Sequence, residues 1–197
     1  KNFLTQLAEN LNKKGLALTP ECRIDPLAFK GKVEEKIIKS DLFWLEEKKR
    51  LSTQSEKSLE EKIKVGEQLE MLKTALFNKY LGEFFTTIRS SLYDDWKNHV
   101  DNLILDYQGN VVCCFDAVSD MSGKDYEIKK VRVIETNRKG GTIIKYGAIF
   151  NRQNQSFILK DIRNVPLFYL CLKPEMVIRA VNNFQTDLAS EDERKIV

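Results

Sequence analysis

The sequence Leu59-Glu-Glu-Lys-Ile-Lys-Val65 opens the stretch that decides the fold, residues 59–98. Apolar residues recur along it at steps of three and four with charges between them, which predicts one amphipathic helix whose first part resembles a heptad repeat. From Phe77 to Trp96 the apolar stripe widens, as suits packing against a folded domain. The narrow first part suits a partner helix of another chain. The residues predicted to make that oligomeric contact are Leu59, Ile63, Leu69, Leu72 and Leu76.

The composition limits the possible classes of protein. A chain of 197 residues fits one large domain or two small ones, and a hydrophobic share of 42% is enough for a core. With 32 basic and 29 acidic residues the net charge of +3 gives no strong signal for a polyanion partner. No apolar run approaches the ~18 residues that a membrane span needs, so no membrane partner is expected.

The cysteines give no sign of a zinc site or another cofactor. Four cysteines and the single histidine, His99, do not follow a zinc-ligand spacing. Cys113 and Cys114 are adjacent in a predicted strand and point to opposite faces. We therefore expect buried free thiols and an intracellular location, nuclear or cytoplasmic.

The order of elements predicts an α+β fold. Residues 1–58 contain two amphipathic helical patterns, and the sequence leaves open whether they fold back on the long helix of residues 59–98. A globular head over residues 99–188 then contains short strands joined by turns, an antiparallel β-meander. Residues 126–135 are one of these strands, and in the strand 111–118 we expect Cys113 and Phe115 on the buried face. Apolar runs at 167–172 and after Pro174 predict C-terminal helices that back the meander, before a polar tail over residues 189–197.

One group of residues points to catalysis. Asp116, followed by Glu127-Ile128-Lys129, resembles the restriction-endonuclease-like nuclease core. In that family two carboxylates hold a divalent metal and the lysine steadies the attacked phosphate. The resemblance implies Mg²⁺ or Mn²⁺ as cofactor, with Glu83 as a further acid from a helix. The family core has a helix after the strand that bears Glu-x-Lys, whereas a hairpin is predicted here.

A second group of residues points to nucleic-acid binding. Basic side chains follow one another along the predicted strand and hairpin, at Lys129, Lys130, Arg132, Arg138 and Lys139. Such a patch can hold phosphates in a salt-dependent way without reading a base sequence. Exposed charge at a hairpin tip is the simpler interpretation of the same residues.

The overall order, a heptad-bearing helix, a small meander and a C-terminal helix, resembles the coiled-coil proteins of kinetochores with an RWD-like globular head, of the monopolin type. The resemblance covers residues 59–185. It is carried by Ser91-Leu-Tyr-Asp-Asp-Trp96, Asn110-Val-Val-Cys-Cys-Phe115, Asp125-Tyr-Glu-Ile128 and Val165-Pro-Leu-Phe-Tyr-Leu170. It implies a non-catalytic scaffold that forms homo- or hetero-oligomers through helices and docks partner proteins on its head, in a chromosomal or other multiprotein complex. The metal-dependent nuclease and the nucleic-acid-binding protein are the alternatives.

Overall fold

The computed structural model describes residues 2–53, 57–118 and 124–171, together with residues 175, 176, 179 and 182. It confirms the α+β class. The helices are α1 (Asn2–Asn12), the 3-10 helix η1 (Pro26–Phe29), α2 (Glu35–Thr53), α3 (Lys57–Leu81), α4 (Leu92–Asn98) and α5 (Lys124–Arg138). The strands are β1 (Phe85–Arg89), β2 (Asn102–Asp106), β3 (Val111–Val118), β4 (Thr142–Asn151), β5 (Ser156–Val165) and β6 (Leu167–Cys171).

Four strands form the main sheet in the order β1-β2-β3-β6. The first three are antiparallel neighbours, and β6 is parallel to β3. A parallel neighbour requires a crossover connection, which here consists of α5 and the β4–β5 hairpin. The predicted simple meander is therefore a mixed sheet plus a separate two-stranded ribbon.

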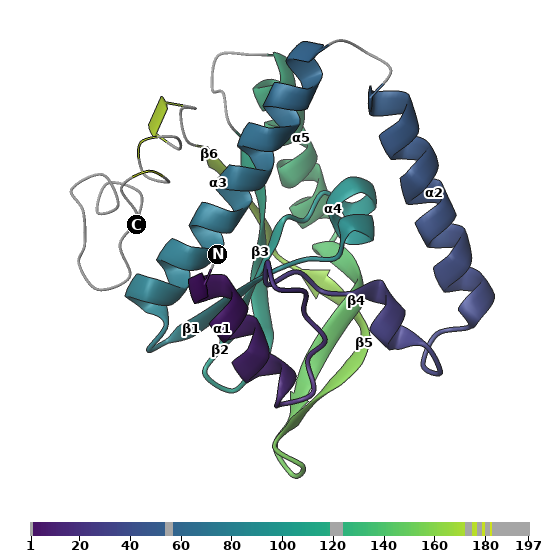
Figure 1. Ribbon diagram of the computed structural model, residues 1–197, viewed down its shortest axis with the longest axis vertical. Helices are drawn as coiled ribbons and strands as arrows, with labels where there is room; N and C mark the ends of the chain where they lie inside the picture. Colours follow the sequence, from purple (N-terminus) through teal and green to yellow (C-terminus); the bar gives the residue numbers. More distant parts are fainter. Residues whose placement is uncertain are drawn as a thin grey trace.

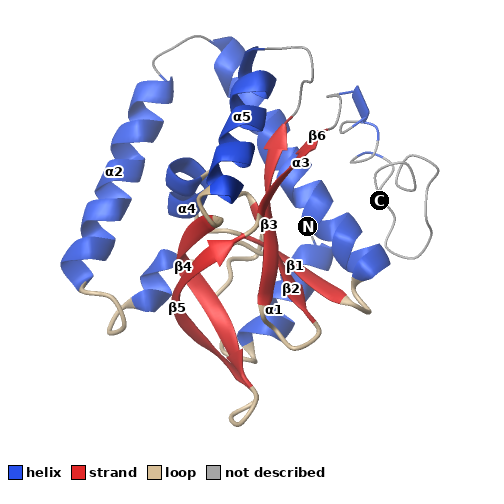
Figure 2. Ribbon diagram, turned by 180° about the vertical axis from the view of Figure 1, so that it is seen from behind, coloured by secondary structure: helices blue, strands red, loops and turns tan. Residues whose placement is uncertain are grey.

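The helices cover the sheet from two sides. In Figure 1 α3 crosses in front of the sheet, and in Figure 2, seen from behind, α5 and the β4–β5 hairpin lie in front. One buried cluster joins Leu4 of α1, Ala75 of α3, Leu103 of β2 and Tyr146 of β4. The predicted boundaries at residues 58 and 98 therefore run through a single hydrophobic core.

The predicted single helix over residues 59–98 is wrong over residues 82–91, which separate α3 from α4. The helix α3 ends at Leu81, and Gly82 follows at a position that suits glycine, because a Cβ added there would lie 2.1 Å from the carbonyl oxygen of Asn78. The chain then enters β1, whose Thr86, Thr87 and Ile88 are β-branched residues that favour strands.

The predicted strand over residues 126–135 is also wrong, because these residues belong to α5. Tyr126 stacks edge-on against Tyr169 at 5.7 Å between ring centroids, Val133 is buried, and Asn137 bonds the backbone of Leu167. These positions lie on one helical face, so packing against β6 overrides the strand preference of Val131, Val133 and Ile134. The β4–β5 hairpin does follow residues 126–135, so the predicted departure from the nuclease core remains.

The apolar run at 167–172 forms β6 up to Cys171, whereas a helix was predicted there. Periodicity cannot separate a short buried strand from a buried helix turn, and here the parallel partner β3 decides. On β3 the buried residues are Cys114 and Asp116, on the face opposite to the predicted one. The predicted helix that starts at Pro174 and the polar tail lie largely outside the described residues.

Candidate metal centre

Two buried aspartates, Asp101 and Asp116, lie at the same end of β2 and β3. The register of these strands ends at Asn102 and Phe115, Asp101 is the residue before β2, and Asp116 is the residue after Phe115. The amide of Asp101 donates to the carbonyl of Phe115 at 2.8 Å, and the amide of Ala117 donates to Oδ2 of Asp101. Both side chains are buried, with exposed fractions of 6% for Asp101 and 2% for Asp116. Buried carboxyl groups cost free energy unless a partner compensates them, so these two aspartates call for an explanation.

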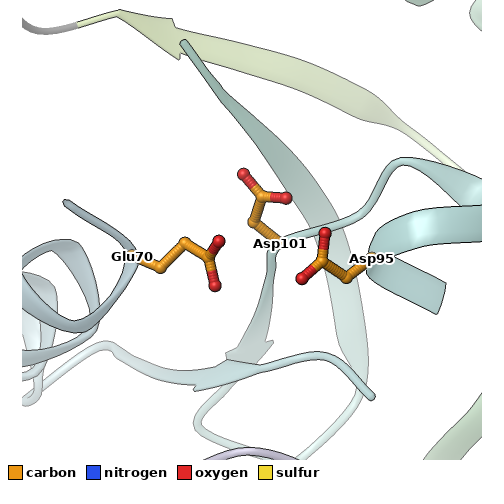
Figure 3. Close-up of side chains that lie close together, drawn as sticks. All are labelled: Glu70, Asp95 and Asp101. Atoms are coloured by element: carbon orange, nitrogen blue, oxygen red, sulfur yellow. The ribbon is translucent and has the colours of Figure 1, made fainter. Parts of the chain in front are cut away.

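Asp101 also belongs to a group of three carboxylates. Glu70 of α3, Asp95 of α4 and Asp101 each offer an oxygen within 4.8 Å of the others, and Figure 3 shows their carboxylates turned toward one another. Burial raises the pKa of Asp101 well above its ordinary value, and the charges of Glu70 and Asp95 raise it further. Burial, followed by the charge of Glu70, raises the pKa of Asp95 to about 7. Such pKa values are typical of carboxylates that share one small space.

Two arginines neutralise part of this group. Arg23 donates to Oε2 of Glu70 at 2.7 Å and to Oδ2 of Asp95 at 3.1 Å. Arg89 donates to the same oxygen of Glu70 at 2.7 and 3.2 Å. Both guanidinium groups are nearly buried, which makes these charge-assisted bonds stronger than surface ion pairs.

Two lysines approach the carboxylate pair. Nζ of Lys129 donates to Oδ1 of Asp116 at 2.5 Å and to the carbonyl of Ala117 at 2.6 Å. Burial disfavours its ammonium, but the charges of Asp116 and Asp101 and the hydrogen bond to Asp116 together raise the pKa of Lys129. Nζ of Lys73 lies 3.9 Å from Oδ2 of Asp101 and is fully buried, and burial lowers its pKa.

Two polar atoms of the centre have no hydrogen-bond partner within the described part of the chain. They are Nζ of Lys73 and Oδ2 of Asp116. The nearest cation to that Asp116 oxygen for which a distance is known is Nη1 of Arg132, at 3.9 Å. Buried polar atoms are nearly always paired in folded proteins, so an open carboxylate oxygen marks a place where a ligand would fit.

Of the predicted catalytic residues, the structure brings together Asp116 and Lys129 but not Glu127. Glu127 lies on the exposed side of α5, where its carboxylate is 3.8 Å from Lys130. Glu83, the predicted helical acid, is exposed in the turn after α3. The helical acid at the centre is Glu70, and the second strand acid is Asp101.

The predicted phosphate-binding residues lie on a helix rather than on a strand and hairpin. Lys129 and Arg132 reach Asp116, and Lys130 pairs with Glu127. Arg138 and Lys139 are exposed at the far end of α5.

The described part of the predicted oligomeric stripe is buried within the chain itself. Leu69, Leu72 and Leu76 are at most 4% exposed, so their own chain already buries them. The side chains of Leu59 and Ile63 lie outside the part that the structure describes. Self-association stays a prediction, and burial by the chain itself is sufficient to explain the three leucines.

Sequence reasoning missed Glu70, Lys73, Asp95, Asp101 and Arg23. A signal existed for Asp101, because it precedes an apolar strand, and Asp116 lies near the end of the next strand beyond a tight turn at Gly109. A hairpin with such a turn brings the outer ends of its strands together. No comparable signal exists for Arg23, which reaches the centre only through tertiary contacts.

Comparison of the chain with protein-family models, curated proteins and solved structures finds no match in any of the three. Among the helices that the structure describes, none has the length and apolar character to cross a membrane.

Proposed function

We propose that the chain is a divalent-metal-dependent nuclease that cleaves DNA, with Asp101 and Asp116 as the metal ligands. The observation that carries the proposal is the burial of these two carboxylates at the same end of β2 and β3, where Oδ2 of Asp116 has no hydrogen-bond partner among the described residues. A buried carboxylate oxygen left open beside a second carboxylate fits Mg²⁺ or Mn²⁺, which prefer oxygen ligands.

A divalent ion bound there would polarise a phosphoryl oxygen and lower the pKa of a bound water. Lys129 is placed to hold the negative charge of a phosphate, because its Nζ already lies 2.5 Å from Asp116 and its side chain is 31% exposed. Arg132 is 32% exposed on the same side of α5 and adds a second cation for the backbone of a nucleic acid. Burial of the carboxylates strengthens these electrostatic interactions.

The order of elements supports the same proposal through the resemblance to the restriction-endonuclease-like core. That core combines strand carboxylates, a lysine on the strand that bears Glu-x-Lys, and a helix after that strand. In this chain α5 follows β3 and supplies Lys129, while Glu70 on α3 is an upstream helical acid. The lysine comes from the helix and not from the strand, which is a departure from the Glu-x-Lys pattern.

The test is cleavage of labelled double-stranded DNA by the purified chain in Mg²⁺, Mn²⁺ or a chelator. We expect cleavage with either metal and none with the chelator. Asp116→Asn and Asp101→Asn should each reduce the rate by about a thousand-fold, because several kcal/mol of transition-state stabilisation is lost with the metal. Glu127→Gln is the matched control, since it removes one negative charge from an exposed position on α5.

Retention of cleavage by Asp116→Asn, or its loss in Glu127→Gln, would contradict the assignment of ligands. Absence of cleavage of DNA with every divalent metal would remove the DNA nuclease, and cleavage of RNA alone would change its substrate. Lys129→Met should slow cleavage by about a hundred-fold, whereas Lys130→Met should have little effect.

Partner docking is a second candidate function, in line with the scaffold prediction, and one surface favours it. Ile128, Val131 and Ile134 are 55, 52 and 43% exposed at successive helical steps on α5. An apolar stripe on a surface helix suits another protein chain. Solution mass measured over a range of concentrations, for the parent chain and for Val131→Glu, tests whether that partner is a second copy.

A further inference from the structure

Arg23 lies between two carboxylates of the three-carboxylate group. Its Nη2 is 2.7 Å from Glu70 and its Nη1 is 3.1 Å from Asp95, so one guanidinium bridges α3 and α4. These are two of the three acids whose oxygens lie within 4.8 Å of one another. The third, Asp101, also interacts electrostatically with Asp116, so it lies between two candidate cation positions.

The connector between α1 and η1 fixes Arg23 in this position. Arg23 forms a parallel bridge with Arg89, the last residue of β1. The amide of Ile24 donates to the carbonyl of Arg89 at 3.1 Å, and the amide of Arg89 donates to the carbonyl of Cys22 at 2.8 Å. The connector thus adds a short piece of strand to the end of β1, and Arg23 is held by backbone as well as by charge.

We infer that Arg23 takes the place of a second divalent ion, so that the centre binds one ion, at Asp101 and Asp116, and not two. The inference rests on the proposed function. Carboxylates arranged around a shared aspartate are the arrangement that two-metal hydrolytic centres use. Here the outer position, at Glu70 and Asp95, is already filled by a cation that cannot lose its proton.

The other cations agree with this assignment. Arg89 donates twice to the same oxygen of Glu70, so the oxygen that faces Arg23 is shared by two guanidinium groups. Lys73 is fully buried, has no hydrogen-bond acceptor within the described residues, and lies 3.9 Å from Asp101. An ion at the outer position would have to displace Arg23 from Glu70 and Asp95, whereas Oδ2 of Asp116 has no hydrogen-bond partner among the described residues.

The test counts bound Mn²⁺ per chain, from the electron paramagnetic resonance signal of the free ion during titration. We expect one ion for the parent chain, one for Arg23→Lys, which keeps the charge, and two for Arg23→Met. Arg163→Met is the matched control, because Arg163 is an exposed arginine paired with Asp161 at 3.1 Å. It should leave the count at one.

Three outcomes separate the inference from the proposed function. Two ions on the parent chain, or one on folded Arg23→Met, would overturn the inference and leave the nuclease standing. No ion on the parent chain would overturn the metal-dependent function itself, and the inference with it. If Arg23→Met does not fold, Asp95→Asn in the parent chain decides, because loss of the single ion would make Asp95 a ligand and a retained ion would support Arg23 as its neutralising partner.

Discussion

Two buried aspartates, Asp94 and Asp116, differ in how completely their oxygens are used. Asp94 is fully buried on α4 and accepts four hydrogen bonds. The donors are the hydroxyl of Ser91 at 2.7 Å, the amide side chain of Asn98 at 2.7 Å, and the backbone amides of Lys145 at 2.7 Å and Tyr146 at 3.0 Å. Asp94 thereby joins α4 to β4.

Asp116 is almost as buried, but within the described residues it receives a hydrogen bond only from Lys129, and its second oxygen receives none. The two residues therefore have different physical roles. A carboxylate whose acceptor sites are all filled stabilises the fold, and binding anything else would break existing bonds. A carboxylate with a buried open oxygen contributes less to stability and is free to bind a ligand.

The largest expected difference is in stability. Asp94→Ala would leave the buried amides of Lys145 and Tyr146 without acceptors, and we expect a loss of about 3 kcal/mol or more in the free energy of unfolding. Asp116→Ala removes a carboxylate with one unpaired oxygen and leaves Lys129, whose side chain is 31% exposed and can be solvated, so we expect a smaller loss of about 1 kcal/mol. Urea unfolding of the metal-free proteins measures both changes.

Equal losses in the two variants would break the comparison, since Asp116 would then be a structural residue as well. Asp106→Ala serves as a reference for an exposed turn, because Asp106 caps the β2–β3 turn through the amides of Gln108 at 2.8 Å and Asn110 at 2.9 Å. The loss of stability in Asp106→Ala should fall between the losses in Asp94→Ala and Asp116→Ala.

A smaller change in stability is expected for a substitution of Lys73. Its ammonium is buried without an acceptor among the described residues, and a methionine would fill nearly the same volume without that cost. We expect Lys73→Met to raise the stability of the metal-free chain by about 1 kcal/mol and to change the metal affinity. The control is Lys130→Met, at a half-exposed position on α5, which should change neither quantity. A marked loss of stability in Lys73→Met would assign Lys73 to the structural network with Asp101.

The sequence could predict elements that local patterns specify, but not those that depend on long-range packing. Local patterns found β3 and β4, because Val111–Val118 and Thr142–Asn151 are bounded by turn residues. The helix α5 was missed because its β-branched residues favour a strand until β6 is present to pack against. Only the final fold specifies such long-range packing.

In the candidate centre, too, the sequence identified only residues that are close together in the chain. Asp116 and Lys129 were found because they are close in sequence, although the prediction placed Lys129 on a neighbouring strand. Glu70 and Arg23 come from segments 47 residues apart, and nothing local in either one indicates that they meet. Charge patterns in a sequence rich in acids and bases cannot distinguish a buried cluster from a solvated surface, because burial is decided by the packing of α3, α4 and the connector on the end of the sheet.

The smallest expected effect is a pH dependence of the stability of the metal-free chain, which comes from Asp95. Burial and the charge of Glu70 raise the pKa of Asp95 from 3.8 to about 7, so between those values the folded chain holds a proton that the unfolded chain has released. The contribution is fully present below the lower pKa, and the stability of the metal-free chain should fall as the pH rises through this window. Thermal unfolding in a chelator should show a melting temperature that decreases by a few degrees from pH 4 to 7.

Asp95→Asn tests this contribution, because the buried Asp94 and Asp101, whose pKa values are also raised by burial, remain in both proteins. An asparagine cannot titrate, so the variant should show a shallower fall in melting temperature over the same pH range. Parallel curves for the two proteins would mean that Asp95 is ionised in the folded chain, with Arg23 sufficient to hold its charge. Arg23 would then be a stronger neutralising partner than the pKa of Asp95 implies, and the outer position would be still less accessible to a second ion.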